Sequence, residues 1–139
     1  MAIAPAGLLP DTMLDTFRAR AAAYDRENRF FQEDFDDLRA AGYLQMAVPK
    51  ELGGLGFSLA EAARQARRLA MYAPPTALAT NMHTYWVGLS ADLWRRGDTS
   101  CEWILRDAAA GQVFAAGHAE TGSDLPLSLS TTKAGRVDD

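Results

Sequence analysis

The sequence has little of several features that would each point to a particular class of protein. It contains one cysteine, Cys101, so no disulfide can form within the chain, and a lone Cys in a helical pattern is usually a packed small hydrophobe. This cysteine use fits a cytoplasmic protein. There is also no basic leader and no apolar run of about 15 to 20 residues, so nothing indicates export or a membrane span.

Basic residues and metal ligands are scarce as well. The chain has 14 Lys and Arg against 18 Asp and Glu, a formal net charge of −4, which argues against a broad attraction to nucleic acid or anionic lipid. A small-molecule or protein partner is favoured. The acidic run from Glu33 to Asp37 includes no His or Cys and therefore indicates a solvated helix face, not a metal site. The glycines of Gly53–Gly56 match neither the dinucleotide fingerprint nor the P-loop.

The residues that are present indicate a mainly α chain. Hydrophobic residues make up 48% and charged residues 23% of the sequence, as in ordinary globular domains. Apolar spacing and stop signals predict about five helices, over residues 11–27, 31–41, 58–73, 76–96 and 99–110. Val113–Ala116 and the alternating Leu125–Ser130 then predict strands. We expect a helical domain over residues 1–111 and the truncated start of a β domain over residues 112–139.

Two segments have the capping-box pattern, in which a hydroxyl and a carboxylate satisfy the first N–H groups of a helix. They are Ser58–Glu61 and Thr99–Glu102.

The fourth predicted helix has two different stripes. A bulky stripe suits core packing: Met82, Tyr85, Trp86, Leu89 and Leu93. A slimmer stripe suits either the border of a cavity or close helix packing: Thr80, Thr84, Val87, Gly88 and Ala91. His83 on this helix is interpreted as a packing residue, whereas His118 has both a catalytic and a structural interpretation.

Several motifs recur in a familiar order. They are Gly42-Tyr43, the connector Val48-Pro49-Lys50-Glu51-Leu52-Gly53-Gly54-Leu55-Gly56, His83, Gly97, Gly111 and the loop Ala119-Glu120-Thr121-Gly122-Ser123-Asp124. In this order and spacing the sequence resembles the acyl-CoA dehydrogenases. The resemblance implies an N-terminal helical domain and the first strands of the middle β domain, in a family whose members hold FAD and also have a C-terminal helical domain.

The resemblance also implies site residues. The loop is two residues shorter than the family's usual form and lacks its proline, and we carry flavin contacts over to Glu120, Gly122 and Ser123. The slim residues Thr84, Val87, Gly88 and Ala91 would face the acyl group of the substrate. No position matches the family's catalytic glutamate, and no metal site is expected.

The leading hypothesis is a fragment of an FAD-dependent oxidoreductase of fatty-acid metabolism, which dehydrogenates an acyl-CoA or another hydrophobic substrate. It would be inactive alone and form a dimer or tetramer when full length. One alternative is a flavin-dependent monooxygenase of the same fold. Another is a non-catalytic helical interaction module.

Overall fold

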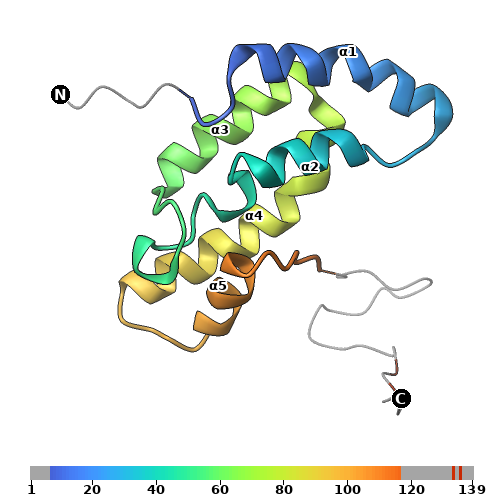
Figure 1. Cartoon of the computed structure of the whole chain (residues 1–139). Coiled ribbons are helices and arrows are strands. Elements are labelled where there is room, and N and C mark those ends of the chain that lie inside the picture. The colour runs from blue at the N-terminus through green and yellow to red at the C-terminus, as the bar shows by residue number, and fades with distance from the viewer. Residues whose placement is uncertain (1–6, 117–132, 134, 136–139) are drawn as a thin grey trace, which may run out of the picture.

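The computed structural model describes residues 7–116, 133 and 135, which fold into helices with short connections (Figure 1). The elements in chain order are α1 (Asp11–Glu27), α2 (Gln32–Ala40), the 3-10 turns η1 (Tyr43–Gln45) and η2 (Lys50–Leu52), α3 (Leu59–Tyr72), α4 (Pro74–Arg95) and α5 (Glu102–Ala109). The mainly helical prediction is confirmed. In the described part of the chain, no helix is both long and apolar enough to cross a membrane.

The predicted strand over residues 113–116 does not form. A strand needs a neighbouring strand as its hydrogen-bond partner, and the described residues contain none. The second predicted strand, Leu125–Ser130, lies outside the described residues. The division between domains at residue 111 stays a prediction.

Helices α3 and α4 form a hairpin that runs through the middle of the molecule (Figure 1). The capping box at the start of α3 is confirmed, because Ser58 N–H donates to the Glu61 carboxylate at 2.8 Å and Ser58 Oγ accepts from Glu61 N–H. Ala73 alone separates the two helices. Pro74 and Pro75 form the first turn of α4, which thus begins two residues before the predicted start, because first-turn residues need no N–H.

The core has two clusters, one at each end of this hairpin. The first joins α1, α2, η1 and α3 through Leu9, Leu14, Phe17, Leu38, Tyr43, Leu44, Met46, Leu69 and Ala73. The second joins the connector, α4 and α5 through Ala47, Val48, Val87, Ala91, Ile104, Leu105 and Ala108. Residues 44–48 contribute to both clusters, so this stretch before the connector holds the two ends of the molecule together.

The prediction for the faces of α4 was wrong. Its buried residues are mostly small or polar, namely Thr76, Thr80, His83, Val87, Ser90 and Ala91. Two members of the bulky stripe, Tyr85 and Leu89, are 55% and 40% exposed. Small side chains on the inner face allow α3 and α5 to approach α4, and the bulky residues are left on the outer face.

The prediction of a second capping box, over Thr99–Glu102, was also wrong. Helix α5 begins at Glu102 after Cys101, with no side-chain cap. The Glu102 carboxylate instead accepts from Trp94 Nε1 at 2.9 Å and from Arg106, while Asp98 accepts from the Ser100 N–H. The four-residue pattern does not tell whether residues outside it, such as Trp94 and Arg106, compete for the carboxylate.

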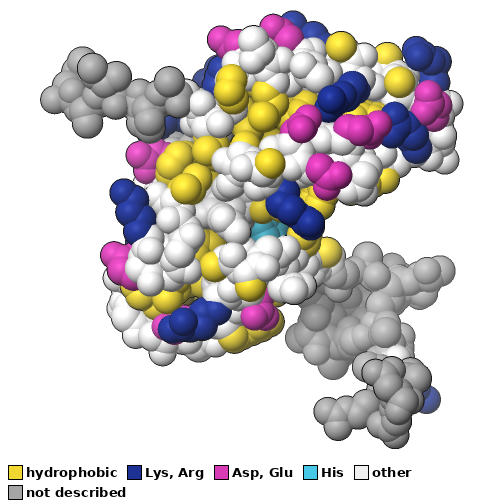
Figure 2. Space-filling model, in the orientation of Figure 1, with side chains coloured by type: hydrophobic (Ala, Val, Ile, Leu, Met, Phe, Trp, Pro, Cys, Tyr) yellow, Lys and Arg dark blue, Asp and Glu magenta, His cyan; other side chains and the backbone are white. Residues whose placement is uncertain are grey.

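The acidic run on α2 is only partly a solvated face. Asp34 is fully buried, and its Oδ1 accepts from Arg20 Nη1 and from the Tyr24 hydroxyl, each at 3.0 Å. Figure 2 shows acidic and basic side chains interspersed over α1 and α2. The run therefore joins α2 to α1 through ion pairs.

Candidate functional site

A cavity of about 540 Å³ lies between α3, α4 and the connector that precedes α3, and we call it the α3–α4 groove. Its lining comes from the connector (Ala47, Gly56, Phe57), the start of α3 (Ser58, Leu59, Ala62) and α4 (Thr84, Tyr85, Gly88, Leu89, Asp92, Arg95, Arg96). The volume is that of a small-molecule site. Most of the lining is apolar, so the groove suits a hydrophobic ligand.

Gly88 provides the open floor of this groove. A Cβ built at Gly88 meets no atom within 4 Å, so close helix packing does not explain this glycine. One turn earlier, the Thr84 hydroxyl donates to Asn81 O at 2.9 Å within its own helix. At these two positions the face of α4 toward the groove therefore has small side chains and is mostly apolar.

One end of the groove is polar. Arg95 Nη2 donates to Phe57 O at 3.1 Å and to Ala47 O at 3.4 Å, and this ties the end of α4 to the connector. Arg96 pairs with Asp92 at 2.7 Å. A ligand with an apolar body and a carbonyl or anionic end matches this distribution of side chains.

The four predicted substrate residues separate into two pairs. Thr84 and Gly88 line the groove, whereas Val87 and Ala91 are buried in the second core cluster. Residues four apart share a helix row, and the pair 87 and 91 lies on the neighbouring row that faces α5. A direct substrate contact from Val87 or Ala91 is therefore not supported by their burial among core residues, while Thr84 and Gly88 remain candidates.

The predicted flavin contacts, Glu120, Gly122 and Ser123, lie outside the described residues, as does His118. Their roles stay predictions. In the described ranges no three His, Cys, Asp or Glu side chains converge as a metal site would require.

His83 is buried, as its predicted packing role requires, and both of its ring nitrogens are engaged. It is 2% exposed, its Nε2 lies 2.8 Å from Leu44 O, and its Nδ1 accepts from Phe114 N–H at 3.2 Å. Burial lowers the pKa of His83, and the Leu44 carbonyl opposes that shift. Because Nδ1 accepts from an N–H group, the ring is in a neutral form in this structure.

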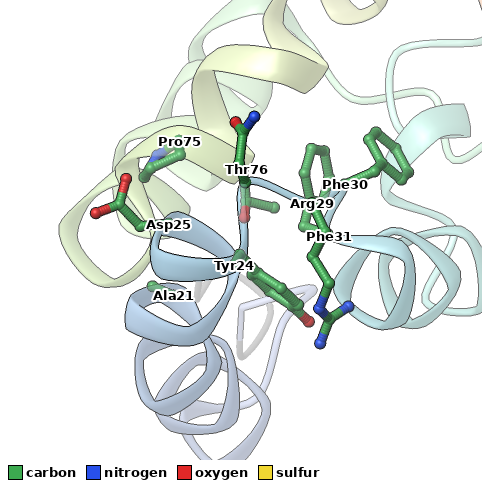
Figure 3. Close-up of a pocket in the computed structure, with 9 residues that line it drawn as sticks. Ala21, Tyr24, Asp25, Arg29, Phe30, Phe31, Pro75 and Thr76 are labelled. Atoms are coloured by element: carbon green, nitrogen blue, oxygen red, sulfur yellow. The ribbon is translucent and has the colours of Figure 1, made fainter.

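A second cavity, of about 410 Å³, lies where the end of α1, residues 28–31 and the start of α4 meet (Figure 3). Tyr24, Phe30 and Phe31 give it aromatic walls. Arg29 lies 4.6 Å from the centre of the Tyr24 ring, but it also pairs with Glu27 and Glu33, so its charge is already balanced. No residue predicted to be functional lies there.

Sequence reasoning missed several residues of the α3–α4 groove. Tyr85 and Leu89 directly follow Thr84 and Gly88 and line the groove, whereas their size predicts a place in the core. Phe57 and Arg95 meet only because the connector folds back on the end of α4, a contact across 38 positions that no local pattern reveals.

Comparison with known proteins agrees with this helical fold. The family model described as the N-terminal domain of acyl-CoA dehydrogenase matches residues 11–99. The chain therefore belongs to the acyl-CoA dehydrogenase family.

Two curated relatives of this chain are named for different activities. The putative acyl-CoA dehydrogenase YdbM of Bacillus subtilis (strain 168) is 32% identical over 111 residues, covering 78% of this chain and 29% of the relative. The amino sugar nitrososynthase DnmZ of Streptomyces peucetius is 35% identical over 115 residues, covering 78% of this chain and 28% of the relative. The chain thus spans less than a third of the length of either. No solved structure matches the chain significantly.

Proposed function

We propose that this chain is the N-terminal helical part of an FAD-dependent oxidoreductase that dehydrogenates an acyl-CoA thioester between its α and β carbons. The observation that carries the proposal is the family match over residues 11–99. The α3–α4 groove supports it, because its apolar walls and open floor at Gly88 suit an acyl chain. Its volume of about 540 Å³ is in the range of small-molecule sites and is large enough for an acyl chain.

The flavin site proposed for this chain consists of Glu120, Gly122 and Ser123, as backbone and hydroxyl donors. Bound flavin would supply the hydride acceptor. The catalytic base matches no residue of this chain, so it belongs to the remainder of a longer protein, and the 139 residues alone are inactive. The complete protein is proposed to be a dimer or tetramer.

The first test is a spectrum of the longer protein. It should be purified with bound flavin, and acyl-CoA added without oxygen should bleach the flavin absorbance. Purification without flavin, or a flavin band that no acyl-CoA bleaches, would contradict the proposal.

A second test addresses the groove. Gly88→Leu places a side chain where a Cβ now meets nothing, so KM for a long acyl-CoA should rise roughly tenfold or more relative to a short one. Asn81→Leu, an exposed site on α4 outside the groove lining, is the matched control. Equal KM changes for both acyl lengths would show that the acyl chain lies elsewhere.

The second candidate is an oxygen-dependent flavin monooxygenase, which the similarity to DnmZ favours. By its name that relative forms a nitroso group on an amino sugar, which adds oxygen to nitrogen. The loop shortened by two residues agrees with altered flavin binding. A colourless protein that consumes oxygen only when reduced flavin is supplied would favour this candidate over dehydrogenation.

A further inference from the structure

The two hydrogen bonds of His83 define a single state of the imidazole ring. The Leu44 carbonyl can only accept, so Nε2, 2.8 Å away, carries the hydrogen. The Phe114 N–H can only donate, so Nδ1, 3.2 Å away, is the bare nitrogen. The geometry fits one of the three forms of histidine, the neutral ring with hydrogen on Nε2.

The same ring connects three separate parts of the chain. His83 lies on α4, Leu44 on η1, and Phe114 on the stretch that follows α5. The Phe114 ring stacks on the His83 ring, with centroids 6.1 Å apart and planes 15° apart. The rings of Trp103 and Phe114 make a T-shaped pair with centroids 5.8 Å apart. Residues 112–116 form no helix or strand, so Phe114 depends on side-chain contacts for its position.

The chain runs from Phe114 to Glu120 in six steps, and Glu120 is the first of the three residues proposed to contact flavin. Fixing the backbone of residue 114 restricts where the following residues can reach, because each residue spans at most about 3.6 Å. We propose that His83, as the Nε2–H tautomer, is a positioning residue that anchors Phe114 and so sets the start of the flavin loop. The anchor stands on the described contacts, and its purpose rests on the proposed function.

A role for His83 in packing alone leads to a different expectation from a role in positioning Phe114. An apolar side chain of similar volume would then serve equally well at position 83. A positioning residue requires a donor on one side and an acceptor on the other, and glutamine keeps both types of group whereas leucine has neither.

The anchor is tested by NMR on the 139-residue chain. The chain has only two histidines, so in the His118→Gln variant every remaining histidine signal comes from His83. We expect a protonated Nε2, an unprotonated Nδ1 and a scalar coupling between Nδ1 and the Phe114 amide nitrogen. A ring with hydrogen on Nδ1, or no coupling to Phe114, would overturn the assignment.

Amide exchange then separates positioning from packing. His83→Leu should speed exchange of the Phe114 amide roughly tenfold or more and leave amides at the centre of α1 unchanged. His83→Gln should restore part of the protection. Equal protection in the leucine and glutamine variants, provided that α1 stays protected, would reduce His83 to a packing residue. If His83→Leu unfolds the chain, protection of the Phe114 amide is compared between His83→Gln and the parent instead. Complete loss of that protection in His83→Gln contradicts the anchor.

The purpose of the anchor is tested in the longer protein by flavin affinity. His83→Leu should raise the flavin Kd roughly tenfold, whereas Met82→Leu, a half-buried neighbour on α4, should not. Flavin bound with unchanged Kd in His83→Leu would refute the positioning role. If the unsubstituted longer protein binds no flavin, but His83→Leu still speeds exchange of the Phe114 amide, the proposed function is refuted and the anchor is retained.

Discussion

A buried carboxylate gives the clearest case of chemistry decided by single residues. Asp34 is fully buried, and its Oδ2 has no hydrogen-bond partner among the described residues, while Oδ1 accepts from Arg20 and Tyr24. Burial raises the pKa of Asp34, against the lowering effects of Arg20 and Tyr24. Burial and the hydrogen bond to Asp34 raise the pKa of Tyr24 to about 12. The Arg20 guanidinium is thus the cation that makes this burial tolerable.

Removing that cation should therefore destabilise the protein. Arg20→Met leaves Asp34 buried without its charge partner and should lower the free energy of unfolding by about 2 kcal/mol. Arg96→Met breaks the exposed pair with Asp92 on α4 and should cost less than about 0.5 kcal/mol. Urea denaturation of both variants measures the difference. Equal losses would show that Asp34 does not depend on Arg20.

His83 should make stability depend on pH. Its pKa in the folded protein is lowered below the ordinary histidine value of about 6.5, so between the two values the unfolded chain binds more protons, and stability falls as pH falls. From about pH 7.5 to pH 5 the free energy of unfolding should decrease, and His83→Gln should remove part of that slope. Tyr43, whose pKa burial raises to about 12, does not titrate there. An identical slope in parent and variant would contradict this assignment.

At the scale of elements, the sequence predicts what local contacts decide. The bounds of α1, the capping box of α3 and the left-handed Gly42 that follows α2 all depend on residues within a few positions of one another. The faces of α4 do not, because periodicity identifies stripes but not which stripe has a neighbour. Tyr85 is exposed for this reason, and the same reason divides the predicted site, leaving Gly88 in the groove and Val87 in the core.

Two glycines in different surroundings test this account of the elements. Gly88→Ala fills open space in a helix and should raise the free energy of unfolding by about 1 kcal/mol. Gly54→Ala places a Cβ 2.3 Å from Val48 O and should destabilise the chain by at least about 1 kcal/mol. Thermal denaturation should shift the two midpoints in opposite directions. A loss of stability in Gly88→Ala would mean that this position is packed after all.

At the scale of the whole molecule, several large apolar side chains of α3 and α4 remain exposed. Leu59, Met71 and Leu78 are 83%, 67% and 76% exposed, and Tyr85 is 55% exposed. Figure 2 shows hydrophobic side chains on the surface beside the charged ones. Exposed apolar area of this kind promotes association in water.

The isolated chain should accordingly associate with itself through exposed apolar side chains such as Leu78. Leu78→Lys should reduce dimerisation in sedimentation experiments and reduce the binding of a hydrophobic dye. Asn81→Lys adds the same charge at an exposed polar site of the same helix and serves as the control. If the two variants behave alike, net charge governs association and apolar area does not.

The connector before α3 has a further consequence for how the chain tolerates change. Backbone bonds from Leu55, Gly56 and Phe57 to Gln45, Val48 and Met46 tie its two arms together. Glu51 lies at the exposed tip between the arms, within η2, and takes part in none of these three bonds. A peptide inserted after Glu51 would interrupt η2 but none of the three bonds between the arms, so both arms should stay joined and the α-helices in place, and this exposed tip is a suitable point at which to attach a label.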